Sequence, residues 1–185
     1  MRDLRIGAVG VIVLVWAVLC PAEWTPIDFT TDGVIEDGDT FTFVHIFSEA
    51  SVDMTGGFIR DGLRLNDTST FNAYGGTLGF ESYLFSQVEV LDSSVLNLYH
   101  WELPEYHLIW TQGDLAKIHV YGSDFLYEAH SSDWWLHGKW ADGDPFTLMF
   151  RGPFTRPNVI LHEIPEPGTI LLLALGGVFL RRQSR

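Results

Sequence analysis

A short strand pattern with a polar centre recurs four times along the middle of the chain, and it restricts the fold more than any other feature. Ser51–Gly57 reads Ser-Val-Asp-Met-Thr-Gly-Gly and returns at Thr70–Gly76 as Thr-Phe-Asn-Ala-Tyr-Gly-Gly. Weaker copies lie at Val95–Tyr99 and Lys117–Gly122. The central residues are Asp53, Asn72, Asn97 and His119. Steps of 19, 25 and 22 residues between them are typical of a solenoid, in which each repeat forms one coil.

Each copy alternates apolar and polar residues with period two, which indicates a strand with one face toward a core. Glu89, in the partial copy Val88-Glu89-Val90-Leu91, is expected to face solvent together with the four central residues. The Gly-Gly pairs supply the free φ of sharp corners, and Asn66–Ser69 and Asp92–Ser94 supply polar turns. The residues expected inside are Val52, Met54, Phe71, Ala73, Val88, Val90, Leu96, Leu98, Ile118 and Val120.

These patterns predict an all-β fold, a short right-handed parallel β-helix of some four coils. Signals for an amphipathic helix are nearly absent between residues 23 and 163. A β-sandwich built from the same short strands is the alternative.

Both ends of this solenoid need covering, because an open coil exposes unpaired backbone groups. Trp134–Trp140 and Phe146–Phe150, joined around an Asp-Gly pair, predict a hairpin that caps the C-terminal end. Thr40–Ile46 is expected to be the N-terminal strand or cap.

A third feature lies near the end of the sequence. Pro165-Glu166-Pro167 is followed by the apolar run Thr169–Leu180 and by Arg181, Arg182 and Arg185. This order resembles the PEP-CTERM sorting signal of exported bacterial proteins. The resemblance implies processing at the tripeptide by an exosortase, a membrane enzyme, with the apolar helix as a transient membrane anchor. The arginines would stay on the cytoplasmic side.

The first residues agree with export. Arg2 and Arg5 precede an apolar run over 6–19, and Ala22 offers a small residue before a cut ahead of Glu23, as in a secretory signal peptide. An uncleaved N-terminal anchor is the competing interpretation. We therefore expect a signal helix at 1–22, a body at 23–163 and a sorting and anchor segment at 164–185, with the product in the envelope, at the cell surface or outside the cell.

The body is strongly acidic. Of 24 acidic residues only Asp3 and Glu166 lie outside residues 23–163, whereas five of the 11 basic residues do, which leaves 22 acids against six bases, a net of −16. Such a surface repels nucleic acid. The single cysteine, Cys20, falls in the signal. The body is therefore expected to be stabilised by packing and hydrogen bonds, without disulfides.

No motif for a nucleophile elbow, a phosphate loop or a dinucleotide site occurs, and we predict that the chain is not an enzyme. Asp37-Gly38-Asp39 and Asp142-Gly143-Asp144 could each turn two carboxylates toward calcium, although an ordinary Asp-Gly turn is favoured. The sequence predicts no metal site and no cofactor, since no metal-ligand spacing links the seven histidines, which are His45, His100, His107, His119, His130, His137 and His162.

Tryptophan is abundant, with six residues after the signal. Adjacent Trp134 and Trp135 must face opposite sides of their strand, so one is expected to be buried and the other exposed. Together with Trp101 they are the candidate ligand-binding residues, because indole faces stack on sugar rings. The sequence favours a structural or interaction protein, and the alternative is a carbohydrate-binding or adhesive module for matrix polysaccharide.

Overall fold

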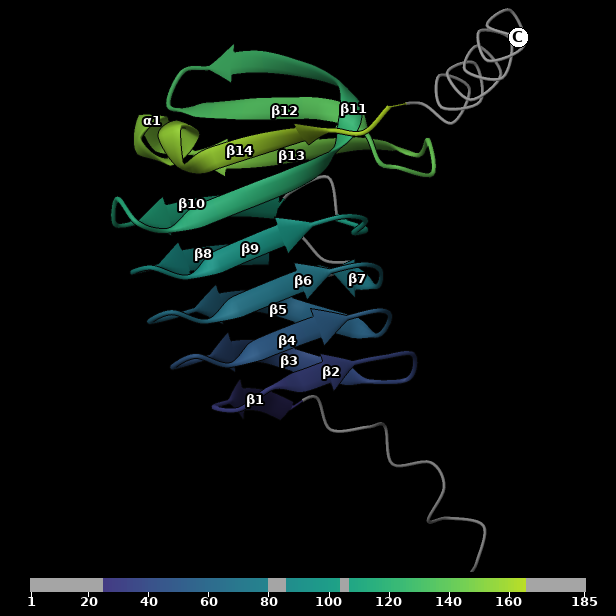
Figure 1. The fold of residues 1–185 in the computed structure, drawn as a ribbon, viewed down its shortest axis with the longest axis vertical. Helices are drawn as coiled ribbons and strands as arrows, with labels where there is room; N and C mark the ends of the chain where they lie inside the picture. The colour runs from purple at the N-terminus through teal and green to yellow at the C-terminus, as the bar shows by residue number, and fades with distance from the viewer. Residues whose placement is uncertain (1–24, 80–85, 104–106, 166–185) are drawn as a thin grey trace, which may run out of the picture.

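The protein is described by a computed structural model that covers residues 25–79, 86–103 and 107–165. Strands wind into stacked coils, and each coil gives one strand to each of two parallel sheets (Figure 1). We call the sheets A and B. Sheet A runs through β1 (Thr25–Phe29), β3 (Thr40–Ile46), β5 (Phe58–Leu65), β8 (Ser86–Leu91) and β10 (His107–Gln112). Sheet B runs through β2 (Gly33–Ile35), β4 (Ser51–Met54), β6 (Thr70–Ala73), β9 (Val95–Leu98), the start of β11 (Lys117–His130) and β14 (Val159–Glu163).

The predicted repeat fixes the register of sheet B. Asp53 pairs with Asn72, Asn72 with Asn97, and Asn97 with His119, all between parallel strands. The longest step, from Asn72 to Asn97, contains β7 (Thr77–Leu78), which pairs with the start of β5 before β8 continues along the same strand. The β-solenoid is thus confirmed, and the sandwich is wrong for these segments because their pairing is parallel. The right hand of the helix stays a prediction.

The interior follows the predicted alternation. Every one of the ten residues expected inside is fully buried. One outward residue differs from the expectation. Glu89 alternates with Val88 and Val90 as predicted, but its side chain is only 8% exposed because it is paired with Arg64 on the neighbouring strand.

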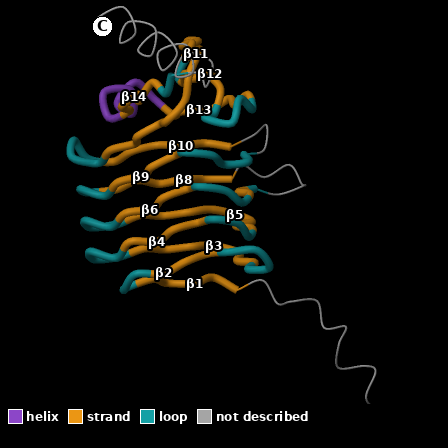
Figure 2. Tube along the Cα trace, turned by 45° about the vertical axis from the view of Figure 1, so that its right-hand side comes forward, coloured by secondary structure: helices purple, strands orange, loops and turns teal. Residues whose placement is uncertain are grey.

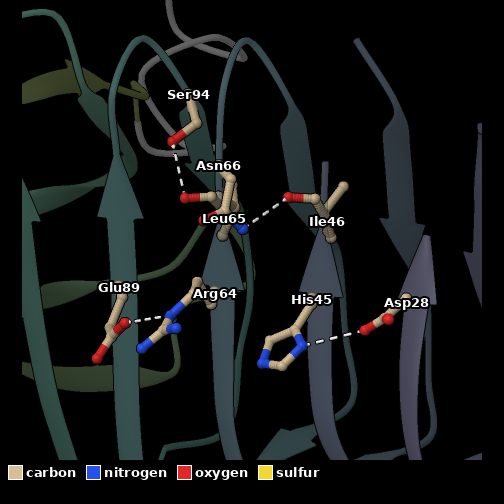
Figure 3. Close-up of polar contacts among 8 residues, drawn as sticks. All are labelled: Asp28, His45, Ile46, Arg64, Leu65, Asn66, Glu89 and Ser94. Carbon is tan, nitrogen blue, oxygen red and sulfur yellow. Dashed lines mark hydrogen bonds and ion pairs between the residues drawn. The ribbon is translucent and has the colours of Figure 1, made fainter. Parts of the chain in front are cut away.

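Polar contacts along the outer face of sheet A join successive coils (Figure 3). Asp28 and His45 occupy paired positions, and Nδ1 of His45 lies 3.0 Å from Oδ1 of Asp28. Arg64 and Glu89 form the next ion pair in the same row. At the adjacent corner, Nδ2 of Asn66 donates to the Ile46 carbonyl at 3.2 Å. These contacts hold neighbouring coils together in a body that has no disulfides.

The corners adopt the conformations that their residues favour. Gly57 and Gly76 have φ of 76° and 83°, a region that costs glycine no strain. At the opposite corner Asp67 and Asp92 have φ of 57° and 55°, and the amide of Asp67 donates to a carboxylate oxygen of Asp92 at 3.1 Å. Aspartate tolerates this left-handed region better than most residues. The two Gly-Gly corners and the two polar turns are confirmed.

The C-terminal end is capped as predicted, with one additional strand. β12 (Asp133–Lys139) and β13 (Pro145–Arg151) form an antiparallel hairpin around the 140–144 turn. The second half of β11 leaves sheet B and pairs antiparallel with β12, so the cap has three strands. β13 also lies parallel to β10, and a short turn of helix, α1 (Gly152–Thr155) and η1 (Arg156–Asn158), leads on to β14. The cap lies at one end of the stack (Figure 2).

The N-terminal expectation needs correction. Thr40–Ile46 is a strand, β3, but it is not the first one. β1 and β2 form an earlier coil that continues both sheets, and β1 pairs with β3 in parallel. This coil lacks the polar centre of the repeat, since Val34 pairs with Asp53, and the sequence pattern therefore does not reveal it.

The expected signal helix over 1–22 and the hydrophobic helix of the sorting segment lie outside the described residues. Within residues 25–79, 86–103 and 107–165, no helix is long and apolar enough to cross a membrane.

Candidate ligand-binding pocket beside the capping hairpin

A pocket of about 520 Å³ lies between the corner that follows β9 and the β12–β13 hairpin. Its walls combine indole rings with groups that donate or accept hydrogen bonds, a composition typical of ligand sites. The aromatic lining residues are Trp101, Trp135, Trp140 and Phe146. The polar lining residues are His100, Glu102, His107, His137, Asp144 and Thr147. We call this site the cap pocket.

The tryptophans have different degrees of exposure. Trp101 is 2% exposed and lies beside Phe71 with ring centroids 5.6 Å apart, and Trp140 is 3% exposed and packs on Phe146 at 4.1 Å. Trp135 is half-buried and stacks with His130 at 4.2 Å. Within the described part of the chain, the buried Nε1 of Trp101 has no hydrogen-bond partner.

The two adjacent tryptophans face opposite sides, as predicted. Trp134 is 6% exposed and its ring stacks on Phe150 at 4.3 Å within the core, whereas Trp135 lines the cap pocket. The structure therefore brings two of the three candidate residues, Trp101 and Trp135, to one pocket. Trp134 is instead a core residue of the cap.

Two histidines are held in place by the hairpin. The amide N–H of Met149 donates to Nε2 of His107 at 3.0 Å, so Nε2 is an acceptor and the ring proton of the neutral form lies on Nδ1. On His137, Nδ1 lies 3.0 Å from Oγ1 of Thr147, and Nε2 lies 3.2 Å from a carboxylate oxygen of Glu128. Such contacts orient imidazoles that could bind ligand hydroxyl groups.

A group of three metal-ligating side chains lies at the pocket rim. Nδ1 of His100 lies 2.7 Å from Oδ2 of Asp142, and Oδ1 of Asp142 accepts the amide N–H of Asp144 at 3.1 Å. That backbone hydrogen bond, together with the nearby imidazole, lowers the pKa of Asp142 below its ordinary value. One ligand atom from each of His100, Asp142 and Asp144 lies within 4.8 Å of the others.

The second Asp-Gly-Asp loop is different. Oδ2 of Asp39 accepts the amide N–H of Glu36 at 3.0 Å, as in an ordinary turn. Among the residues described by the structure, the group around Asp142 is the one set of three or more histidine and acidic side chains close enough to hold a cation.

The remaining histidines serve other contacts. His119 and His162 lie on neighbouring strands with Nδ1 and Nε2 2.7 Å apart, and His45 pairs with Asp28. His162 also ends a row of rings on sheet B, in which Tyr74, Tyr99, Tyr121 and His162 stack at 4.7, 4.2 and 4.3 Å. Burial raises the pKa of the Tyr121 hydroxyl. The stacked rings join successive coils along the outside of sheet B.

The sequence did not indicate any of the six polar lining residues as ligand-binding groups, namely His100, Glu102, His107, His137, Asp144 and Thr147. They belong to separate segments that only the packing of the hairpin against the last coils brings together. A local signal existed for Asp144, whose Asp-Gly-Asp loop was recognised, but nothing in the sequence connects that loop with His100.

Immediately after the last strand, Ile164 donates its amide to the Gly122 carbonyl at 2.7 Å, and Pro165 is exposed. Residues 163–185 match the PEP-CTERM protein-sorting motif. Glu166, Pro167, Arg181 and Arg182, the other predicted sorting residues, lie outside the described residues. No curated protein and no solved structure matches the chain.

The fold and the sorting motif together define a class, an exported β-solenoid protein. More specifically, the chain carries a PEP-CTERM sorting signal, which implies processing by an exosortase-type enzyme and association with the membrane. Its destination is the cell envelope, the cell surface or the extracellular space.

Proposed function

We propose that this exported protein binds a matrix polysaccharide in the cap pocket. The observation that supports the proposal most strongly is the half-buried indole of Trp135, which lines one pocket together with Trp101, Trp140 and several hydrogen-bonding side chains. Sugar rings present apolar C–H faces and polar hydroxyl edges. A site that offers an indole beside imidazoles and carboxylates matches both.

The polar groups are suited to hydroxyl recognition. Glu102 accepts a hydrogen bond from Oγ1 of Thr77 at 2.9 Å and is exposed, so its carboxylate is fixed and faces water. The carboxylates of Glu102 and Asp144 are acceptors for sugar hydroxyl groups. His107 and His137 line the pocket with rings that their contacts to Met149, Thr147 and Glu128 hold in place. A volume of about 520 Å³ lies within the usual range for small-ligand sites, about 300–1,000 Å³.

Charge narrows the class of polysaccharide. The body carries a net charge of −16, and two of the pocket's lining side chains are carboxylates. A polyanionic glycan would be repelled during its approach and within the site. The proposed ligand is therefore a neutral glycan, and the prediction that the chain is not an enzyme is retained.

Glycan-array binding tests this proposal. The full chain is compared with Trp135→Ala and with Tyr74→Ala, which removes an exposed ring from the stacked row on sheet B. We expect the parent chain to bind a set of neutral glycans. Affinity for these glycans should fall at least tenfold in Trp135→Ala and stay unchanged in Tyr74→Ala. Absence of glycan binding would favour a purely structural role, and equal binding by all three proteins would show that glycans bind outside the cap pocket.

A further inference from the structure

The geometry points to a binding site for a zinc-like divalent transition-metal ion, formed by His100, Asp142 and Asp144. The ligand atoms of these residues lie within 4.8 Å of one another. An ion bonded to an imidazole nitrogen at about 2.0–2.1 Å and to carboxylate oxygens at about 2.0–2.2 Å would draw these three atoms closer together. The site does not depend on the proposed sugar binding.

The kind of donor selects the kind of ion. Calcium and magnesium prefer sites made of oxygen ligands, whereas imidazole suits zinc, copper, iron and nickel. His100 brings one nitrogen to two carboxylates, and we therefore favour zinc over calcium for this Asp-Gly-Asp loop. Three protein ligands also leave a fourth tetrahedral position for water or another molecule.

The three residues come from two segments that are far apart in the sequence. His100 comes from the corner after β9, whereas Asp142 and Asp144 come from the hairpin turn between β12 and β13. Gly143 between them has φ of 96°. The turn is closed by two hydrogen bonds, from the Trp140 amide to the Asp144 carbonyl and from the Gly143 amide to the Trp140 carbonyl. The ion would therefore join the capping hairpin to the last coils, and its binding would stabilise the cap.

The three side chains differ from an ordinary surface ion pair because they lie beside the cap pocket. His100 and Asp144 both line the cap pocket, so the open coordination position is within reach of a bound molecule. The pocket also contains Trp101, whose buried Nε1 has no partner among the described residues.

The test measures zinc binding to the full chain by equilibrium dialysis, beginning from chelator-treated protein. Three variants are compared, Asp142→Asn, His100→Gln and Asp39→Asn. Asp142 does not line the cap pocket, so its variant separates loss of metal from loss of sugar binding. Asp39→Asn is the matched control in the other Asp-Gly-Asp loop, and melting without metal verifies that each variant is folded.

One zinc ion per chain is expected, with affinity reduced at least tenfold in Asp142→Asn and His100→Gln and unchanged in Asp39→Asn. Cobalt(II) should give the visible absorption of a four-coordinate site in the parent and in Asp39→Asn. Equal zinc binding by all four proteins would show that the acidic surface attracts zinc without a site. Calcium binding that is insensitive to His100→Gln, or no zinc binding at all, would also overturn the proposal.

Discussion

The side-chain amide of Asn97 donates from Nδ2 to Oδ1 of Asn72 at 2.7 Å, across two successive coils of sheet B. Asn72 in turn donates to Oδ1 of Asp53 at 2.7 Å. The three residues occupy paired positions, so their side chains form a continuous polar ladder along the outside of the stack. Such a ladder fixes the register of neighbouring coils in addition to the backbone hydrogen bonds.

Asn97→Asp is predicted to destabilise the protein by about 1–2 kcal/mol, because the variant loses the Nδ2 donor and turns a carboxylate oxygen toward an oxygen of Asn72. Urea unfolding measures the change. Gln112→Glu makes the same chemical change at an exposed position and is expected to remain within about ±0.5 kcal/mol. Equal effects of the two substitutions would show that the ladder contributes nothing specific.

Arg64→Ala is predicted to cost about 2 kcal/mol, since it leaves the carboxylate of Glu89, whose side chain is only 8% exposed, without its ion-pair partner. Arg60→Ala is the control, because Arg60 pairs with the more exposed Asp61 and such pairs contribute about 0–1 kcal/mol. The double variant Arg64→Ala, Glu89→Gln should recover part of the loss. If Arg60→Ala destabilised the protein more than Arg64→Ala, the burial of Glu89 would not explain how much each ion pair contributes to stability.

His119 is predicted to make the fold less stable in mild acid. Burial, the neighbouring His162 and Lys117 lower its pKa below 6.5, so the folded state favours the neutral ring. The stability contributed by the neutral His119 ring is fully present above the pKa of the unfolded state. It is lost as the pH falls from about 6.5 through the lower pKa of the folded state. Thermal melting between pH 7.5 and 5.5 should show a smaller loss for His119→Asn, which cannot titrate, than for the parent.

His45→Gln serves as the control for that titration, since His45 lies on the other sheet beside Asp28. The parent and His45→Gln should share the acid-dependent loss. A profile for His119→Asn that matches the parent would place the titrating group elsewhere.

The repeat allowed the parallel register of β4, β6, β9 and β11 to be predicted from sequence because each coil returns the same polar residue to the same place. Three features escaped because they depend on contacts between distant segments. Glu89 follows the alternation but is covered by Arg64, β11 changes sheets partway along its length, and β14 returns to sheet B beyond the hairpin. Local periodicity carries no information on such contacts.

The candidate site, too, could be predicted only in part from the sequence. Trp101 and Trp135 could be singled out by residue type, and the opposite faces of Trp134 and Trp135 follow from strand geometry. The meeting of His100 with Asp142 could not be predicted, since it depends on how the hairpin docks on the coils.

Processing is predicted at both ends of the chain. Because the sorting motif contains the Pro165-Glu166-Pro167 tripeptide at which processing is expected, the mature protein should lack the residues after about Pro167 and before about Glu23. Intact-mass measurement of protein from an exporting host checks this. A species that retains Arg185 in the mature fraction would contradict it.

The indole N–H resonances of ¹⁵N-tryptophan-labelled protein test the central claim, that the cap pocket binds a neutral glycan, most directly. Single Trp→Phe variants assign the signals, and a glycan identified on the array is titrated into the full chain. Shifts are expected for Trp135, Trp101 and Trp140. The resonance of Trp110, which lies on β10 and does not line the pocket, should stay unchanged. Shifts confined to Trp110, or no shifts at saturating glycan, would contradict this claim.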